Sequence, residues 1–491
     1  MNHVVSVIIL PPSQILRLRS EDDGSIIVDT RITSLKVPGA APLLNTKDQN
    51  FQVSVTLEGR KFALGSVPLN TTGTEFPLSL DFLSPRKEPY TITCSAEVSG
   101  KTYETTNQLL YLEPPVEGSV TKQDLRTGSL LVKSGNTWEP ILPIGFYTSF
   151  DGFLVNVSNV DLIKARGDGR MNLIHPVPTF DNMTALESML DRMEELGLWL
   201  IYDMRNTYKN LTSVAEQVNM IKDRPNLLLW YTADEPDGPG DPLNATAIAK
   251  AFINELDGGG YHPVSLALNC ENHYFEDYST GADVVLQDAC IDYGCCGCDN
   301  CIGSFEDIST RVDEFKQRLD LLGRGRSTAV WSVPQAFGNQ TFWPRYPTGQ
   351  EWLVESVVAI NHGSLGITPW ADPSTTEIDD ASSTLAATGS QIIQFLANPL
   401  AEITHIIQDG VDIAFWTIPS TKRALMLVAN MNSQSISIVI GGAAGTIVEV
   451  LNSGAALNIE QAGQTVLSLD GIGTAGYIFE EGMSVETRIV S

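Results

Sequence analysis

Two adjacent carboxylic acids end an apolar run near the middle of this chain. The stretch LLLWYTADEPDG, residues 227–238, is largely apolar as far as Ala233 and continues with Asp234, Glu235 and Pro236. At the mouth of a fold, the charge of Asp234 and the partial loss of water would raise the pKa of Glu235. A carboxyl that keeps its proton near working pH acts as a general acid, so the pair predicts proton-transfer chemistry.

The elements that would position these acids repeat between residues 140 and 397. Near-continuous apolar runs, typical of parallel strands covered on both faces, alternate there with helical patterns. The predicted strands are 140–147, 170–177, 196–203, 227–233, 263–269, 282–288, 328–334 and 364–370. The predicted helices are 182–196, 210–223, 245–256, 305–321, 347–362 and 383–397, with a weak one after the fifth strand. Eight strands in about 230 residues predict an α/β fold, a (β/α)8 TIM barrel. A doubly wound sheet is disfavoured because no Gly-rich phosphate loop follows the first strand.

Both flanks of this region alternate apolar and polar residues in short runs, as antiparallel strands do. FQVSVTLEG and YTITCSAEV are examples from the first flank, and DIAFWTIPS and RALMLVANMN from the last. We therefore expect an N-terminal β-sandwich over residues 1–118, the barrel over 119–401 and a C-terminal β-sandwich over 402–491.

Polar side chains gather where the predicted barrel strands end. In such a barrel the carboxyl ends of all strands meet at one face, so their side chains converge. The catalytic candidates at these positions are Glu235, Asp234, Asp203, Asp288 and Glu271, and the substrate-binding candidates are Tyr147, His175, Arg205, Asn269, Gln335, Trp343 and Trp370. A carboxylate-rich cup with aromatic walls suits sugar rings, and cleavage of a glycosidic bond needs a proton donor and a second group that handles positive charge. We expect Glu235 to be the donor.

Three stretches resemble the clan A glycoside hydrolases. LLLWYTADEP resembles the fourth-strand motif of that clan, in which a strand ends in Asn-Glu-Pro and the Glu is the acid/base. GSLLVKSGNTWEPILPIGFY resembles the hairpin that leads into the first strand, and GSLGITPWAD resembles the eighth strand with its terminal aromatic. The resemblance spans roughly residues 125–400 and implies a glycosidase with Glu235 as acid/base.

The chain departs from the clan pattern at two positions. Asp234 replaces the Asn, and Gln335 stands where the resemblance implies a nucleophilic Glu at the end of strand seven. An amide cannot form the covalent intermediate that a carboxylate forms. Three explanations stay open. Asp203, Glu271 or Asp288 supplies the second carboxylate; the Asp234-Glu235 pair works as in the barrel N-acetylhexosaminidases, where the substrate's acetamido group is the nucleophile; or the protein binds glycans without cleaving them.

The acidic composition limits the choice of partners. The chain carries 31 Lys and Arg against 59 Asp and Glu, a formal net charge of −28. Such a surface repels nucleic-acid phosphates and anionic membranes, so we expect neither as a partner and a carbohydrate instead. No cofactor and no metal are expected, because no phosphate loop and no regular pair of metal-binding motifs is present. The sequence leaves the oligomeric state open.

The cysteines indicate an oxidising compartment. Six of the seven lie between residues 270 and 301, and Cys295 and Cys296 are adjacent, which suits zinc ligation poorly. Disulfide bonds are therefore favoured over a thiolate metal site, and Asn-x-Ser/Thr sequons such as the one at Asn182 agree with a secreted glycoprotein. The first residues lack a basic start and a cleavage site, so we expect an edge strand there with any signal peptide already removed.

Overall fold

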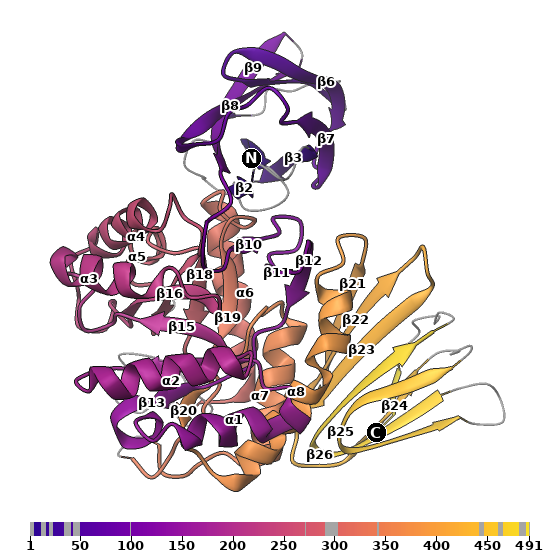
Figure 1. The fold of residues 1–491 in the computed structure, drawn as a ribbon. Helices are drawn as coiled ribbons and strands as arrows, with labels where there is room; N and C mark the ends of the chain where they lie inside the picture. Colours follow the sequence, from indigo (N-terminus) through magenta and orange to yellow (C-terminus); the bar gives the residue numbers. More distant parts are fainter. Residues whose placement is uncertain are drawn as a thin grey trace.

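The structure is a computed structural model that describes residues 4–10, 16–18, 23–33, 41–42, 50–98, 100–270, 272–289, 303–340, 343–440, 446–459, 465–480 and 488–490. Antiparallel sheets come first along the chain, a parallel sheet with helices follows, and another antiparallel sheet ends the molecule (Figure 1). Among the described helices, none is both long and apolar enough to cross a membrane.

A closed parallel sheet forms the centre of the molecule. Its strands pair in chain order and are β13 (Tyr147–Ser149), β14 (Leu173–Val177), β15 (Trp199–Asp203), β16 (Leu227–Asp234), β17 (Val264–Leu268), β18 (Val284–Gln287), β19 (Ala329–Ser332) and β20 (Trp370–Asp372). Parallel bridges from Ser332 to Ile367 and from Gln335 to Trp370 join the last strand to its neighbour across the closure. The predicted parallel sheet is confirmed, and its closure makes it a (β/α)8 barrel.

Helices cover the barrel and return the chain from each strand to the next. They are α1 (Ser158–Gly169), α2 (Met183–Glu195), α3 (Leu211–Ile221), α4 (Ala245–Leu256), α5 (Phe275–Ser279), α6 (Phe305–Leu321), α7 (Gly349–Asn361) and α8 (Thr376–Leu396). Thr348 and Glu351 form the expected capping box before α7. The prediction missed α1, which buries only Val160, Ile163 and Gly167, too few positions for a clear helical period.

The first antiparallel region consists of two facing sheets. One contains β1 (Val4–Leu10), β3 (Asp23–Thr33), β4 (Ala41–Pro42) and β7 (Thr74–Ser79), and the other contains β2 (Leu16–Leu18), β5 (Asn50–Leu57), β6 (Arg60–Pro68), β8 (Arg86–Val98) and β9 (Lys101–Leu112). Val28 of the first sheet and Phe51 and Ile92 of the second belong to one apolar core. A three-stranded sheet of β10 (Thr121–Gln123), β11 (Leu130–Ser134) and β12 (Thr137–Ile141) then leads into the barrel.

The C-terminal region is one antiparallel sheet, whereas a two-sheet sandwich was expected. Its strands are β21 (Glu402–Gln408), β22 (Val411–Ile418), β23 (Arg423–Asn430), β24 (Ile436–Ile440), β25 (Ile447–Ile459), β26 (Thr465–Phe479) and β27 (Arg488–Val490). The long strand β26 pairs with β24 through its first half and with β23 through its second half, so hydrogen bonds connect the whole sheet. Register shifts along β25 let the pair bend. Alternation in the sequence predicts the flanking strands but does not distinguish one curled sheet from two.

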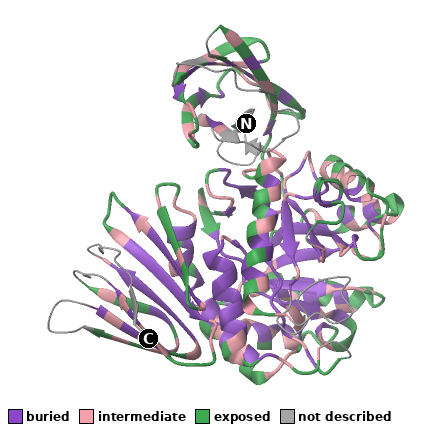
Figure 2. Cartoon of the chain, turned by 180° about the vertical axis from the view of Figure 1, so that it is seen from behind, coloured by how far each residue is buried: buried purple, intermediate pink, exposed green. Residues whose placement is uncertain are grey.

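Helices α7 and α8 lie between the barrel and the C-terminal sheet (Figure 1). Trp416, Leu425 and Ile478 from that sheet belong to the same apolar core as the barrel. Buried residues accordingly continue from the barrel into the adjoining strands of the sheet (Figure 2). This shared core fixes the C-terminal sheet against the barrel.

Candidate active site

Glu235 directly follows strand β16, at the carboxyl end of the barrel. Its backbone is in the left-handed region, with φ of 50°, which is uncommon for a residue with a side chain. Its N–H donates to the carbonyl of Ala267 on β17 at 3.1 Å, and its own carbonyl accepts from the N–H of Gly238 at 3.0 Å. The neighbouring strand and a tight turn therefore hold an unfavourable backbone conformation, as is common at functional sites.

Asp288 follows strand β18 and meets Glu235 at the same end of the barrel. The two carboxyl groups are close enough to form a hydrogen bond with each other, which requires that one of the two carries a proton. Burial, together with the charges of Asp288 and Asp234, raises the pKa of Glu235 to about 9. Burial and the charge of Asp234 raise the pKa of Asp288 to about 7. Near neutral pH the pair therefore keeps one proton, which the protonated carboxyl can donate to its neighbour.

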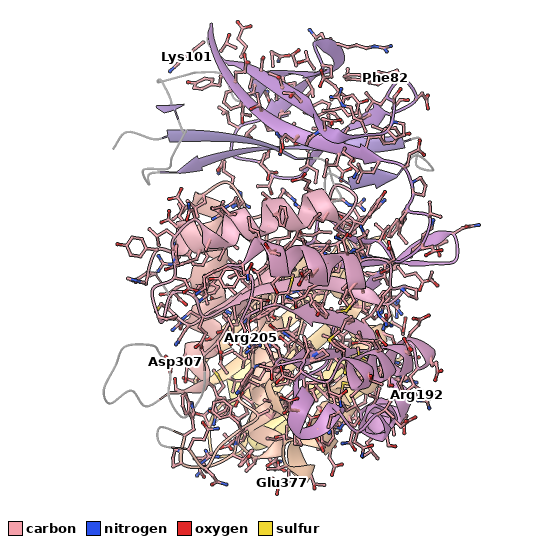
Figure 3. The ribbon with its side chains drawn as sticks, turned by 60° about the vertical axis from the view of Figure 1, so that its left-hand side comes forward. Phe82, Lys101, Arg192, Arg205, Asp307 and Glu377 are labelled. Atoms are coloured by element: carbon pink, nitrogen blue, oxygen red, sulfur yellow. The ribbon has the colours of Figure 1, made fainter. Side chains whose placement is uncertain are left out.

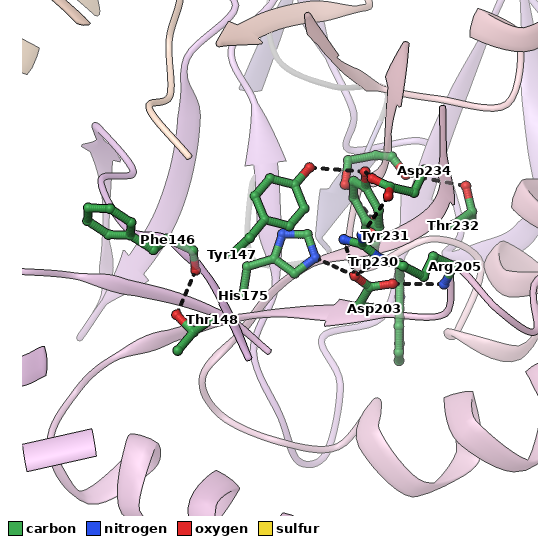
Figure 4. A network of polar contacts seen from close by, with 11 residues as sticks. Phe146, Tyr147, Thr148, His175, Asp203, Arg205, Trp230, Tyr231, Thr232 and Asp234 are labelled. Carbon is green, nitrogen blue, oxygen red and sulfur yellow. Dashed lines mark hydrogen bonds and ion pairs between the residues drawn. The ribbon is translucent and has the colours of Figure 1, made fainter. Parts of the chain in front are cut away.

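Arg205 is the centre of a second set of contacts beside this pair (Figure 4). Its Nε donates to Asp203 Oδ2 at 2.7 Å and its Nη1 to Asp234 Oδ2 at 2.5 Å. His175 Nε2 lies 2.8 Å from the same Asp203 oxygen, and burial lowers the pKa of this imidazole. Arg205 is largely buried among the ends of the barrel strands, whereas Arg192 of α2 is more exposed and is labelled toward the right-hand edge of the molecule in Figure 3. The cation therefore pairs directly with two carboxylates in the barrel mouth, and its charge also acts against the rise in the pKa of Asp288.

Aromatic rings surround the guanidinium of Arg205. Its central carbon lies 5.2 Å from the ring centre of Tyr147, 5.4 Å from that of Tyr231 and 5.0 Å from that of Trp370. The hydroxyl of Tyr231 donates to Asp234 Oδ1 at 2.5 Å and accepts from the hydroxyl of Tyr147 at 3.0 Å. Both oxygens of Asp234 thus accept a hydrogen bond from a neighbouring side chain, which fixes its orientation.

Several predicted substrate-binding residues are occupied by contacts within the protein. Tyr147 and His175 are buried, and their rings stack with centres 4.0 Å apart. The buried side-chain amide of Gln335 donates to the carbonyl of Phe337 at 3.0 Å, and its backbone N–H donates to Glu355 at 2.7 Å. These contacts give Tyr147, His175 and Gln335 a clear structural role, and their part in substrate binding stays a prediction.

The remaining predicted residues lie at the rim of the barrel. Asn269 follows β17, and its N–H donates to Asp237 Oδ1 at 3.3 Å. Trp370 is half-buried, as is Trp343, whose ring centre lies 5.0 Å from that of Phe337. Glu271 is outside the described residues.

Three residues near the carboxyl pair were not predicted. Tyr231 lies inside the apolar run of β16, where nothing marked its hydroxyl. Asp237 is buried and accepts from the N–H of Cys270 at 2.7 Å, so it joins the loops after β16 and β17. Arg311 of α6 is buried, and its charge acts against the rise in the pKa of Asp288. The DEPD spacing was the available signal for Asp237, whereas Arg311 belongs to a helix far along the chain.

A cavity of about 350 Å³ lies beside the site between the loops after β14 and β15. Asp203, Phe180 and Tyr202 are among its lining residues, and neither Glu235 nor Asp288 is. The cavity therefore adjoins the network of Arg205 without containing the carboxyl pair. We locate the chemistry at the pair, because hydrogen bonding and charge converge there.

The cysteines lie in two different settings. Cys94 is a free thiol buried in the N-terminal sheets, and burial raises its pKa to about 12. Cys270 is disulfide-bonded. Cys290, Cys295, Cys296, Cys298 and Cys301 are outside the described residues, so the predicted stapled loop stays a prediction.

Comparison with known proteins gives structural neighbours and no sequence relatives. No family model matches the sequence. No curated protein matches it either. A putative alpha-galactosidase from Bacteroides fragilis is 12% identical, with a TM-score of 0.48, and the match covers 91% of this chain and 94% of that one. A GH30 endoxylanase from Clostridium papyrosolvens is 12% identical, with a TM-score of 0.44 and coverage of 70% and 98%. A beta-glucuronidase from Parabacteroides merdae is 11% identical, with a TM-score of 0.36 and coverage of 99% and 78%. Likeness at this level does not identify an activity or a substrate.

Proposed function

We propose that this protein is a glycoside hydrolase of the clan A type, with Glu235 as the general acid/base and Asp288 as the second carboxylate. The observation that carries the proposal is the hydrogen-bonded pair of these two carboxyls at the carboxyl end of the barrel strands. One of the two keeps its proton near neutral pH while the other has lost it, which is the arrangement of a glycosidase acid and its partner.

The pair supports a two-step reaction with retention. Glu235 would donate its proton to the glycosidic oxygen while the carboxylate of Asp288 attacks the anomeric carbon and the bond to the leaving group breaks. Water, which gives a proton to the Glu235 carboxylate, would then hydrolyse the ester on Asp288 and release the sugar. Inverting enzymes hold their carboxyls about 6.5–9.5 Å apart to fit a water between them, and retaining ones about 5–5.5 Å apart. Hydrogen-bonded carboxyls lie closer than either separation, so a bound sugar must part them, and the shorter separation, that of retention, is the nearer of the two.

Asp234 is a positioning residue in this scheme. Its carboxylate orients Arg205 and Tyr231 and adds negative charge beside Glu235, which raises the pKa of the acid. These contacts also disfavour the acetamido mechanism, because in that mechanism the Asp must turn toward the substrate. Asp203 accepts a hydrogen bond from Arg205 on the other side of the guanidinium, and it is the next candidate after Asp288 for the second catalytic carboxylate.

The test is product release by mass spectrometry from a panel of plant, fungal and bacterial polysaccharides and acetamido glycosides. Glu235→Gln should lower the rate about 10²–10⁴-fold, the usual contribution of a general acid. Glu187→Gln is the matched control, since Glu187 is an exposed residue of α2 with the same change in charge. Equal rates for the native protein and Glu235→Gln would refute the assignment. Glycans that bind and stay intact would show a binding protein instead.

The cellular location, the disulfide bonds and the domain bounds are a further part of this proposal. We propose a secreted glycoprotein with disulfide bonds in residues 270–301, and domains at 1–118, 119–401 and 402–491. Support comes from the disulfide at Cys270 and the six clustered cysteines. Alkylation of the unfolded, unreduced protein followed by mass spectrometry should label one thiol per chain, that of Cys94. Labelling of several thiols would contradict the stapled loop.

A further inference from the structure

A second cluster of titratable side chains joins the barrel to the C-terminal sheet. His362 directly follows α7, His405 lies on β21 and Asp412 lies on β22. Because the helices of the barrel run opposite to its strands, the end of α7 lies at the end of the barrel away from Glu235. The cluster is therefore separate from the candidate active site.

The ligand atoms of these three residues converge. Asp412 Oδ2 lies 2.8 Å from His362 Nε2, and Asp412 Oδ1 lies 3.1 Å from His405 Nε2. One atom from each of the three side chains lies within 4.8 Å of the others. The two imidazole rings are edge to face, with centres 4.3 Å apart, so both Nε2 atoms approach the one carboxylate.

The residues behind these three fix their orientation. Asp313 of α6 lies 2.8 Å from His362 Nδ1, the ring nitrogen that faces away from Asp412. A histidine that binds a metal usually donates its other N–H to a carboxylate in this way. Asn361 Nδ2 donates to Asp412 Oδ1 at 2.6 Å. The side-chain oxygen of Asn361 is buried without a hydrogen-bond donor among the described residues, which leaves an acceptor for a water beside the cluster.

Charge pairing alone accounts for only part of this arrangement. A protonated His362 between Asp313 and Asp412 would already be compensated on both sides. His405 then adds a second imidazole on the other oxygen of Asp412, with its side chain 26% exposed to solvent while that of Asp412 is fully buried. This geometry leaves a route from solvent to the point where the three ligand atoms meet.

We propose that His362, His405 and Asp412 form a site for a divalent transition metal ion of the zinc type. Two nitrogen ligands favour such an ion over calcium or magnesium, which take oxygen ligands. The cation would replace the protons now shared between the imidazoles and the carboxylate. Zn–N and Zn–O bonds of about 2.0–2.1 Å at tetrahedral angles put ligand atoms roughly 3.3 Å apart, which is within the 4.8 Å that now encloses one ligand atom from each side chain. Three protein ligands and one water complete the site, which would clamp the C-terminal sheet to α7.

The experiment uses the full-length protein after treatment with a chelator and desalting. Titration with ZnCl2 followed by calorimetry should show one tight site per chain, and CoCl2 should give the visible absorption of a tetrahedral site. His405→Gln should weaken binding at least 100-fold, and Asp313→Asn, which removes only the partner of His362, should weaken it about 10-fold. His273→Gln is the matched control, because it removes another exposed histidine.

The outcomes separate the proposal from its alternatives. Circular dichroism checks that each variant is folded, and His405 is the safest ligand to change because it is the most exposed. Binding that is absent from the native protein, or that persists unchanged in a folded His405→Gln variant, would overturn the proposal. A thiolate-to-cobalt charge-transfer band would place the ion on cysteines and overturn it equally.

Discussion

The two ends of the barrel each hold a buried polar cluster, and the clusters differ in whether a buried carboxyl faces opposite charges or another carboxyl. At the far end, the carboxylate of Asp412 faces His362 and His405, and these partners lower its pKa. At the mouth, burial raises the pKa of both Glu235 and Asp288, helped by the charge of Asp288 at Glu235 and by the charge of Asp234 at Asp288. Opposite charges are matched at one end and like charges are confined together at the other.

The difference between the two clusters indicates that one stabilises the fold and that the other serves function. A matched charge network holds elements together, because loss of either partner leaves an uncompensated buried charge. The pKa of both confined carboxyls is raised in the folded state, so the folded state loses stability as pH rises above the ordinary pKa of a carboxyl. Arg205 forms ion pairs with Asp203 and Asp234, and its charge offsets only part of the rise in the pKa of Asp288. An arrangement that costs stability at a barrel mouth is expected of a catalytic site.

The largest effect is expected from a substitution that breaks the pair of Glu235 and Asp288 at the barrel mouth. Asp288→Asn should lower kcat on the order of 10⁴-fold, because the amide cannot attack the anomeric carbon. Asp203→Asn should cost much less, since Asp203 contacts Arg205 and His175 rather than Glu235. Initial rates on the substrate identified by product release measure both.

Chemical rescue distinguishes a nucleophile from a positioning residue at Asp288. Azide added to Asp288→Ala should restore turnover and yield a glycosyl azide, because the small anion enters the space left by the carboxylate. Rescue of Asp203→Ala in place of Asp288→Ala would exchange the two roles.

Removing Asp412 from its network with His362 and His405 should lower the free energy of unfolding and leave the reaction rate unchanged. Asp412→Ala leaves His362 and His405 without the carboxylate that they share, and loss of one partner of a buried ion pair costs about 3–5 kcal/mol in the free energy of unfolding. Urea denaturation in the presence of a chelator measures this cost without metal. Asp313→Asn is the matched comparison: its side chain is 58% exposed, so the loss should stay below about 1 kcal/mol. Equal losses of unfolding free energy in Asp412→Ala and Asp313→Asn would contradict the expected difference between the buried and the exposed carboxylate.

The sequence predicts the end of the barrel that holds Glu235 better than it predicts the junction between the barrel and the C-terminal sheet. Strand ends in a parallel barrel share one face, so Asp234, Glu235 and Asp288 were predicted there from their positions alone. Which two of them touch depends on side-chain directions that apolar runs do not encode. Tyr231 was hidden because a tyrosine within an apolar strand has the pattern of a core residue.

The junction could not be predicted, because its parts come from different folding units. His362 ends a barrel helix, whereas His405 and Asp412 lie on a β-hairpin, and no local spacing links the helix to the hairpin. The single curled C-terminal sheet escaped prediction for a similar reason. Alternation reports which residues face inward but not how a long strand such as β26 bends between two partners.

The pH dependence of the rate sharpens the comparison. The active form of the pair carries one proton, so kcat/KM should rise as Asp288 ionises, near pH 7, and fall as Glu235 ionises, near pH 9. The two limbs report the pair as a whole, since its carboxyls titrate together. Asp234→Asn removes a charge that raises the pKa of both, so both limbs should move to lower pH. A profile with its acidic limb near pH 4 would mean that the carboxyls are separated in solution.

The smallest expected effect is a gain in stability when the proposed catalytic acid, Glu235, is replaced. The pKa of Glu235 is raised in the folded state, so the stability that its protonated form provides is present below the ordinary pKa of about 4.3 and is lost as pH rises toward 9. Gln cannot ionise, so Glu235→Gln should gain on the native protein by roughly 1–2 kcal/mol between pH 5 and pH 8. Urea denaturation at both pH values measures the gain, and Glu187→Gln should show none. If the variant lost stability with rising pH as steeply as the native protein does, Glu235 would be solvated and its pKa would be that of an ordinary carboxyl. The two ends of the barrel would then differ in the partners of their carboxylates but not in the cost of burying them.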